Sequence, residues 1–133
     1  AGGQGDVTQT HLLWKHSTKH TDHIVSPIIT GNQMLLIKGG GIATCFNTQG
    51  GKSLFSRPQR IENTCEYFAS PVYGDGKIYV AGENGFVVVL KNEGSHLEIL
   101  ARNDMGDAIL ANPAISDGRI FIRTRSQLIC VAN

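Results

Sequence analysis

The sequence predicts an all-β protein built from repeats of one short unit, and three observations carry this prediction. First, the motif Ser-Pro-Val-Tyr-Gly-Asp-Gly-Lys-Ile-Tyr-Val at residues 70–80 returns in related form at residues 26–37 and 112–122. Second, the proline of this motif recurs after 44 residues and again after 42. Third, apolar and polar residues alternate within each copy, which is the period of a strand. A period in the low forties, with short apolar runs broken by Gly and Asp, is typical of a propeller blade.

The middle repeat, residues 70–101, carries the clearest hairpin signals. Asp75-Gly76 separates two apolar runs, and a type I′ turn needs positive φ at both central positions, which this pair tolerates. The sequence Gly-Glu-Asn-Gly at residues 82–85 indicates a second turn. Residues 86–90 and 97–101 then give a third and a fourth strand. Four antiparallel strands per repeat make one blade.

The other repeats are matched to the same plan. The first, residues 26–56, has its fourth strand at residues 53–56, whereas the third, residues 112–133, supplies three strands. Residues 11–16 indicate an orphan fourth strand with no blade before it. The expected fold is a single partial β-propeller domain over residues 1–133, with four-stranded antiparallel blades: an orphan outer strand, two full blades and one three-stranded blade.

Composition narrows the function classes. The chain of 133 residues is long enough for one domain with a core, and its 12 Lys and Arg nearly balance 11 Asp and Glu. This balance gives no reason to expect a nucleic-acid partner. Apolar runs such as residues 86–90 are far shorter than the roughly 20 residues of a membrane helix. We therefore expect no nucleic acid and no membrane span.

Several sequence features recur at fixed places in the repeats. They are Ser70-Pro71, Asp75-Gly76, the glycines of residues 82–85, the stretch CFNTQGGKSLF at residues 45–55, and Trp14 in a closing strand. In these features the chain resembles the pyrroloquinoline-quinone-like (PQQ-like) β-propeller repeats. It is also similar to the last part of large propeller proteins of planctomycete-like bacteria. This resemblance implies a C-terminal part of a longer propeller, exported across the inner membrane.

The resemblance implies two kinds of function. Some propellers of this family are quinone-dependent dehydrogenases with a vicinal disulfide, a tryptophan under the quinone, and an Asp, a Glu and an Asn around Ca²⁺. Others are cofactor-free scaffolds. This sequence has no Cys-Cys pair, and its single tryptophan lies in the expected outer strand. We favour a non-catalytic binding or scaffolding propeller with no cofactor, no bound metal and no catalytic residue. The alternative is part of a quinone- and calcium-dependent alcohol or sugar dehydrogenase whose cofactor ligands lie outside this chain.

The segments that connect blades are the expected binding surface, because in propellers they gather at one face near the axis. Solvated linkers would have the same polar composition. The partner expected there is a protein, a peptide or a carbohydrate. The candidate residues in these segments are Arg60, Glu62, Glu66, Tyr67, Asp104 and Asp107.

Histidines and cysteines offer two further candidates. His11, His16, His20 and His23 could hold Zn²⁺ or Ni²⁺ if they converged. Their spacing is irregular, and a strand would place the first two on opposite faces. We therefore expect a polar loop there and leave metal binding open.

The three cysteines occupy two kinds of position. Cys45 and Cys130 fall at the same place in their repeats, on the third strand, and are expected to be buried between blades. About one blade apart, they are too distant for a disulfide. Cys65, in a connection, is expected to be the exposed and more reactive thiol.

Three blades cannot close a ring, because propellers typically have four to eight. Both flanks of the arc would expose apolar sheet faces. One solution is a homo-oligomer, most simply a six-blade dimer in which residues 11–16 of one copy pair with residues 127–132 of the other. In the second solution, the missing blades belong to the same longer polypeptide.

Overall fold

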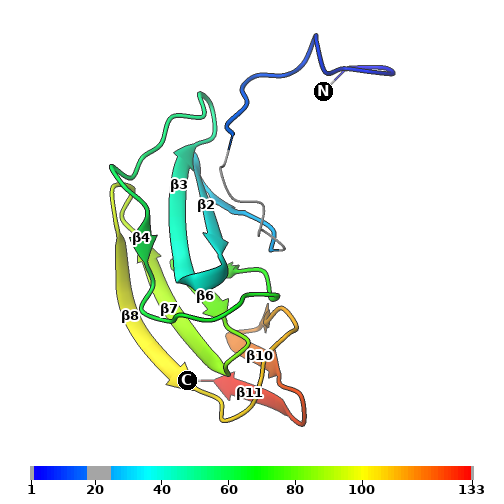
Figure 1. The fold of residues 1–133 in the computed structure, drawn as a ribbon. Coiled ribbons are helices and arrows are strands. Elements are labelled where there is room, and N and C mark those ends of the chain that lie inside the picture. The colour runs from blue at the N-terminus through cyan, green and yellow to red at the C-terminus, as the bar shows by residue number, and fades with distance from the viewer. Residues whose placement is uncertain (1, 18–24, 133) are drawn as a thin grey trace.

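A computed structural model describes residues 2–17 and 25–132. These residues form eleven strands in three antiparallel sheets, and their one helical element is the short turn η1 (Gly39–Gly41). Figure 1 shows the sheets following one another along the chain as an arc, with the N-terminal segment at the end away from the third sheet. The all-β, three-blade arrangement expected from the repeats is therefore confirmed. No helix in the described part of the chain is long and apolar enough to cross a membrane.

Blade 1 has the strand order β1-β2-β3-β4, with β1 (Ile28–Thr30), β2 (Gln33–Lys38), β3 (Ile42–Asn47) and β4 (Gln59–Arg60). Its fourth strand differs from the one expected at residues 53–56. Ser53 makes a single bridge to Phe46, and regular pairing resumes only at β4. The stretch from Ser53 to β4 is longer than the stretch of β3 that it faces, so its extra residues form a loop. Pro58, which has no N–H to donate, ends this loop.

Blade 2 is the most regular sheet, with β5 (Val72–Gly74), β6 (Lys77–Ala81), β7 (Phe86–Asn92) and β8 (Leu97–Asp104). Its first turn has the expected geometry, since Asp75 and Gly76 have φ values of 50° and 72°. The pairing of β7 with β8 shifts between Val89 and Leu90, where a bulge lets the outer strand bend. This outer strand runs to Asp104, three residues beyond the expected end.

Blade 3 has three strands in the order β11-β10-β9, with β9 (Ala114–Ser116), β10 (Arg119–Arg123) and β11 (Leu128–Ala132). β11 therefore lies at an edge, and no strand of the described chain pairs with its outer side. Residues 11–16 form no strand, which differs from the expected orphan strand. They have no neighbouring strand edge within the described chain with which to pair.

Two apolar clusters lie between successive blades. The larger one joins blades 1 and 2 and contains Leu35, Ile37, Ala43, Cys45, Phe55, Ile61, Tyr67, Ile78, Val80, Val88 and Leu90. The smaller one joins blades 2 and 3 and contains Ala69, Ala81, Val87, Ile109 and Ile122. Blade 2 is thus packed on both of its faces. Each blade buries its apolar residues against its neighbours, as in other repeat architectures.

The cysteine positions follow from this packing. Cys45 pairs with Leu35 and Cys130 pairs with Phe121, so the two thiols do occupy equivalent positions on the third strands. Cys45 is buried because blade 2 covers it, which confirms the expectation for this residue. The expectation for Cys130 is wrong: it is exposed, since no described blade follows blade 3. Cys65 is half-buried rather than the most exposed of the three.

Candidate functional site

One end of the three sheets collects both the connections and the second turn of every blade. In a four-stranded antiparallel meander, the turn between strands two and three lies at the end where strand four finishes. The turns at residues 39–41, 82–85 and 124–127 therefore share an end with the connections at residues 61–71 and 105–113. We call these five segments, together with the strand residues directly next to them, the connection face.

Backbone hydrogen bonds fasten the connections to the turns. Two join the first connection to the turn of blade 1, one joins it to the turn of blade 2, and the second connection is held by the turns of blades 2 and 3. They run from Gly40 N to Cys65 O (2.9 Å), Ile61 N to Gly41 O (3.0 Å), Glu83 N to Glu66 O (3.0 Å), Met105 N to Gly85 O (2.9 Å) and Arg125 N to Ala108 O (2.8 Å). Each connection is therefore held by the turns of both blades that it joins.

Glycine allows the close approach of turn and connection. Gly85 has a φ of 87°, and a Cβ placed on it would lie 2.7 Å from the carbonyl oxygen of Asp107. Gly41 likewise has no room for a Cβ, because the carbonyl of Asn63 lies against it. The connections pass directly over the turn glycines, which explains why both positions are glycine.

Three of the candidate residues gather around the turn of blade 1. Arg60 ends β4, is exposed, and donates from Nη1 to the carbonyl oxygen of Gly40 at 3.2 Å. Glu62 is exposed and adopts a positive φ of 56°. The exposed Glu66 places its carboxylate beside Gly39. One cation and two carboxylates thus lie on the same part of the connection face.

Tyr67 is a core residue and not part of this surface. Its side chain is 3% exposed, and its hydroxyl donates to the carbonyl oxygen of Asn63 at 2.7 Å. Burial raises the pKa of Tyr67 well above its usual range. Nearby, the side-chain amides of Asn63 and Asn84 exchange two hydrogen bonds, at 3.2 and 2.8 Å. This network satisfies the polar groups that hold the connection inside the fold.

Asp104 and Asp107 lie at the second connection and have different roles. Asp107 Oδ2 accepts from both the N–H and the hydroxyl of Ser126, each at 2.7 Å, and Oδ1 accepts from Ala108 N at 2.8 Å. The hydrogen bonds from Ser126 lower the pKa of Asp107 to about 2. Asp107 therefore clamps the turn of blade 3 to the connection. Asp104 is exposed and accepts one hydrogen bond, from Gly106 N at 2.8 Å.

The structure adds charged residues that the sequence reasoning missed. Glu83, Arg123 and Arg125 are exposed; Glu83 and Arg125 lie in second turns, and Arg123 ends β10 directly before one. Arg123 and Arg125 line a shallow hollow of about 180 Å³ beside Ala108 and Leu110. Strand order alone could have placed them, because the second turn of a meander lies at the same end as its connection. The face is thus mainly acidic over blades 1 and 2 and basic beside blade 3.

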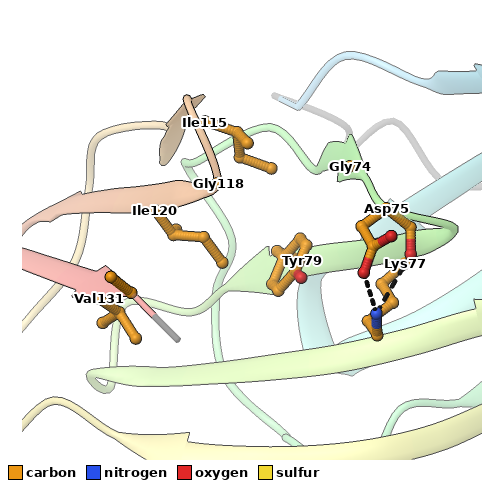
Figure 2. A pocket seen from close by; sticks show the side chains of 9 residues that line it. Gly74, Asp75, Lys77, Tyr79, Ile115, Gly118, Ile120 and Val131 are labelled. Atoms are coloured by element: carbon orange, nitrogen blue, oxygen red, sulfur yellow. Dashed lines mark hydrogen bonds and ion pairs between the residues drawn. The ribbon is translucent and has the colours of Figure 1, made fainter.

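A second hollow lies between blades 2 and 3, at the opposite end of the strands. Figure 2 shows it, with Tyr79 of β6, Ile115 of β9, Ile120 of β10 and Val131 of β11 around one space of about 500 Å³. At one side of the hollow, Lys77 Nζ and Asp75 Oδ2 form an exposed ion pair at 2.6 Å. We call this hollow the interblade groove.

The described histidines make separate contacts. His11 Nδ1 lies 2.7 Å from the hydroxyl of Thr10, and the ring of His16 packs 4.6 Å from that of Phe46. His20 and His23 lie outside the described residues. Within residues 2–17 and 25–132, no group of three or more His, Cys, Asp or Glu side chains could hold a metal ion.

The residues present do not fit a quinone of the dehydrogenase type. Trp14, the single tryptophan, donates from Nε1 to the carbonyl oxygen of Thr48 at 2.8 Å, and its ring covers Gly51. This ring therefore packs on blade 1 and offers no stacking surface to a cofactor on the axis. The three cysteines form no disulfide in the structure, and none is adjacent to another in sequence.

The three antiparallel sheets define the chain as a protein of the β-propeller class. Among solved structures it is similar to BamB from Moraxella catarrhalis, with a TM-score of 0.63 and 17% identity over 78% of this chain and 29% of that one. It is also similar to the computationally designed Ika8 protein, with a TM-score of 0.60 and 8% identity over 80% of this chain and 32% of that one. The chain spans less than a third of the length of either structure.

These similarities show the fold alone, because the identities are low. A scan against protein-family profiles found no match, and a search of curated protein sequences found none. Membership of the PQQ-like repeat family therefore remains a proposal.

Proposed function

We propose that this chain is part of a non-catalytic binding or scaffolding propeller of the PQQ-like repeat kind, which presents its connection face to a protein, peptide or carbohydrate. One observation supports this proposal most directly: the exposed charges stand on loops that backbone hydrogen bonds fix to the turns beneath them. Loops ordered before binding lose little conformational entropy when a partner docks. A surface of this kind favours recognition.

The binding residues we propose are Arg60, Glu62, Glu66 and Asp104, with Asp107 as a positioning residue. All four are exposed on the connection face. The carboxylate of Asp107, in contrast, already accepts hydrogen bonds from Ser126 and Ala108. The acidic part of the face and the arginines beside blade 3 together favour a partner that carries charges of both signs. Protein and peptide surfaces meet this condition, and carboxylates can also accept hydrogen bonds from sugar hydroxyls.

Selection from a random peptide display library and binding to a glycan array test this function. We expect a ligand whose affinity falls at least tenfold in the double variant Glu62→Lys, Asp104→Lys. The matched control is Glu98→Lys, on the outer strand of blade 2 near the opposite end, which should bind as the unmodified chain does. Equal losses in both variants would show that binding does not use the connection face.

The dehydrogenase alternative is tested in the same preparation. Addition of pyrroloquinoline quinone and Ca²⁺ is expected to give no stoichiometric complex and no dye-linked oxidation of alcohols or glucose. Saturable quinone binding at micromolar concentration with turnover would overturn the scaffold proposal. Export across the inner membrane, which the repeat resemblance implies, belongs to the same proposal.

A further inference from the structure

The two connections meet the turns that follow them in the same way. Glu83 N donates to the carbonyl oxygen of Glu66 at 3.0 Å, and Arg125 N donates to that of Ala108 at 2.8 Å. Both residues of the second bond lie 42 residues after those of the first, which is also the spacing between the prolines of these two repeats. Blades 2 and 3 therefore present equivalent positions on the connection face, and their side chains can be compared one by one.

An exposed apolar side chain lies close to each of these bonds. Along the first connection, Glu66 and Phe68 are exposed while Tyr67 between them is buried, because alternate residues of an extended chain point to opposite sides. Leu110 takes the place of Phe68 in the second connection. Phe68 is 39% exposed and Leu110 is 49% exposed. Each connection thus presents an apolar side chain to solvent near the turn that holds it.

The charges at the equivalent positions have opposite signs. Glu66 and Glu83 place two carboxylates where the first connection meets blade 2, whereas Arg125 places a guanidinium where the second connection meets blade 3. Arg125 lines one hollow together with Leu110 and Ala108. Within the described part of the chain, none of these three charged side chains forms an ion pair. They can therefore pair with charges on a partner.

The exposure of these side chains does not depend on what packs against the flanks of the three blades. Blade 2 has a blade against each of its faces, and Phe68 and Glu83 are nevertheless exposed. Leu110 and Arg125 occupy the equivalent positions of blade 3. A blade against the far face of blade 3 would therefore leave them exposed as well.

The exposure of Arg123 is of a different kind. Arg123 lies 42 residues after Ala81, which is buried in the cluster between blades 2 and 3. A blade against the far face of blade 3 would cover Arg123 in the same way. Arg125 is thus the arginine that stays on the surface in either case.

The acidic and the basic positions lie on either side of one turn. Glu83 and Gly85 belong to the turn of blade 2, and a Cβ on Gly85 would lie 2.7 Å from the carbonyl oxygen of Asp107 in the second connection. Asp107 precedes Ala108, whose carbonyl accepts from Arg125. Consecutive Cα atoms are about 3.8 Å apart and paired strand residues about 5.5 Å, so this path puts the backbones of Glu83 and Arg125 within about 24 Å. About seven residues of extended peptide can span this distance.

We propose that the partner of the connection face is a peptide segment that carries a basic and an acidic residue no more than about seven positions apart. This proposal rests on the binding function proposed above and names its ligand. The basic residue pairs with Glu66 and Glu83, the acidic residue pairs with Arg125, and apolar residues between them cover Phe68 and Leu110. Arginine suits a carboxylate, because its planar guanidinium can donate two parallel hydrogen bonds.

Other ligands match these charges less well. A neutral sugar carries no charge that could pair with Arg125 or with the glutamates. An acidic glycan or a nucleic acid would be repelled by the carboxylates of Glu66 and Glu83, and a purely basic peptide would be repelled by Arg125. A segment with both charges is the ligand that leaves no like charges opposed.

Four synthetic peptide libraries test the charge pattern. Each library has two fixed positions about six residues apart and random uncharged residues elsewhere. The fixed pair is Lys with Glu in both orders, two Lys, two Glu, or two Ser. The best peptides with Lys and Glu should bind at least about tenfold more tightly than the best of the other libraries, and added salt should weaken them. Equal or tighter binding by peptides of another library would contradict the pattern.

Charge reversal tests which residues make the contacts. In Arg125→Glu, the affinity for a selected Lys–Glu peptide should fall at least about fivefold, because a repulsion replaces an exposed ion pair. Changing the Glu of the peptide to Lys should restore part of this loss in the variant. Arg119→Glu, the same change at the opposite end of β10, is the matched control and should bind as the unmodified chain does. No loss in Arg125→Glu, or an equal loss in Arg119→Glu, would overturn the assignment.

The apolar contact is tested by two leucines of similar exposure. Leu110→Ser should lower the affinity for the same peptide by about threefold to tenfold, because apolar area is no longer buried on binding. Leu100→Ser serves as control, since Leu100 is 41% exposed but lies on the outer strand β8. Equal affinities in the two variants would contradict the contact with Leu110.

The same variants separate this proposal from the binding function on which it rests. A peptide or glycan whose affinity falls in Glu62→Lys, Asp104→Lys but not in Arg125→Glu would overturn the charge pattern and leave the binding function standing. A chain that binds no peptide from any library and no glycan would overturn both.

Discussion

Asp107 is the residue whose role depends most clearly on hydrogen bonding. It accepts two hydrogen bonds from Ser126 and one from Ala108, and so joins the turn of blade 3 to the second connection. From the sequence we placed it among candidate binding residues. The structure shows its carboxylate already engaged, and a partner that used it would have to break these bonds.

We expect the stability of the fold to depend on the ionisation of Asp107. Its folded-state pKa of about 2 lies below the ordinary 3.8, so the charged form stabilises the native state above pH 3.8. This stabilisation is lost as the pH falls from 3.8 to about 2. Asp107→Asn should lower the urea midpoint at pH 7, and its midpoint should depend less on pH in that window. Urea unfolding at several pH values measures both, with Glu98→Gln as control.

The burial of Tyr67 and the exposure of Cys130 could not be predicted from the sequence. Tyr67 lies in a polar connection, and its hydroxyl can be buried because it donates to the carbonyl oxygen of Asn63. Cys130 sits at the same place in its repeat as Cys45, but its burial depends on a neighbouring blade. Local pattern thus predicts strand position, whereas exposure depends on what packs against the strand.

At the scale of elements, the strands with strong local signals were predictable. The turn signals and apolar runs of the middle repeat identified β7, which was expected at residues 86–90 and spans Phe86–Asn92. β4 was misplaced, because its pairing depends on a loop of irregular length before Pro58. The end of the sheet that carries Arg60, Glu62, Glu66 and Asp104 followed from the order of strands, which the repeat pattern already contained.

The contact between each second turn and its connection can be tested with two glycines. Gly76 and Gly85 both have positive φ, but only at Gly85 would a Cβ meet backbone atoms, those of Asp107. Gly76→Ala should cost about 1 kcal/mol of unfolding free energy from backbone strain. Gly85→Ala should cost roughly 2 kcal/mol more, because the connection must move. Denaturant midpoints measure the difference, and equal costs would show that the turn and the connection are not in tight contact.

At the scale of the whole molecule, protection is expected to be unequal among the blades. Blade 2 packs on both faces, whereas no strand of the described residues pairs with the outer edge of β11. In native-state hydrogen exchange, the amides of β6 and β7 should exchange most slowly, at the free energy of global unfolding. The amides of β11 should exchange faster. Uniform protection across the three sheets would show that all three open only together, in global unfolding.

The connection face also has a consequence for valency. Its two connections lie at the same end of the sheets, and each is held by the turns of both blades that it joins. A partner that recognises a feature on each connection could engage both at once. The second contact forms at a high effective concentration, and avidity can exceed the affinity of one site by about a hundredfold or more. Weak individual recognition by a few surface charges would then suffice for durable attachment to an extended or repetitive target.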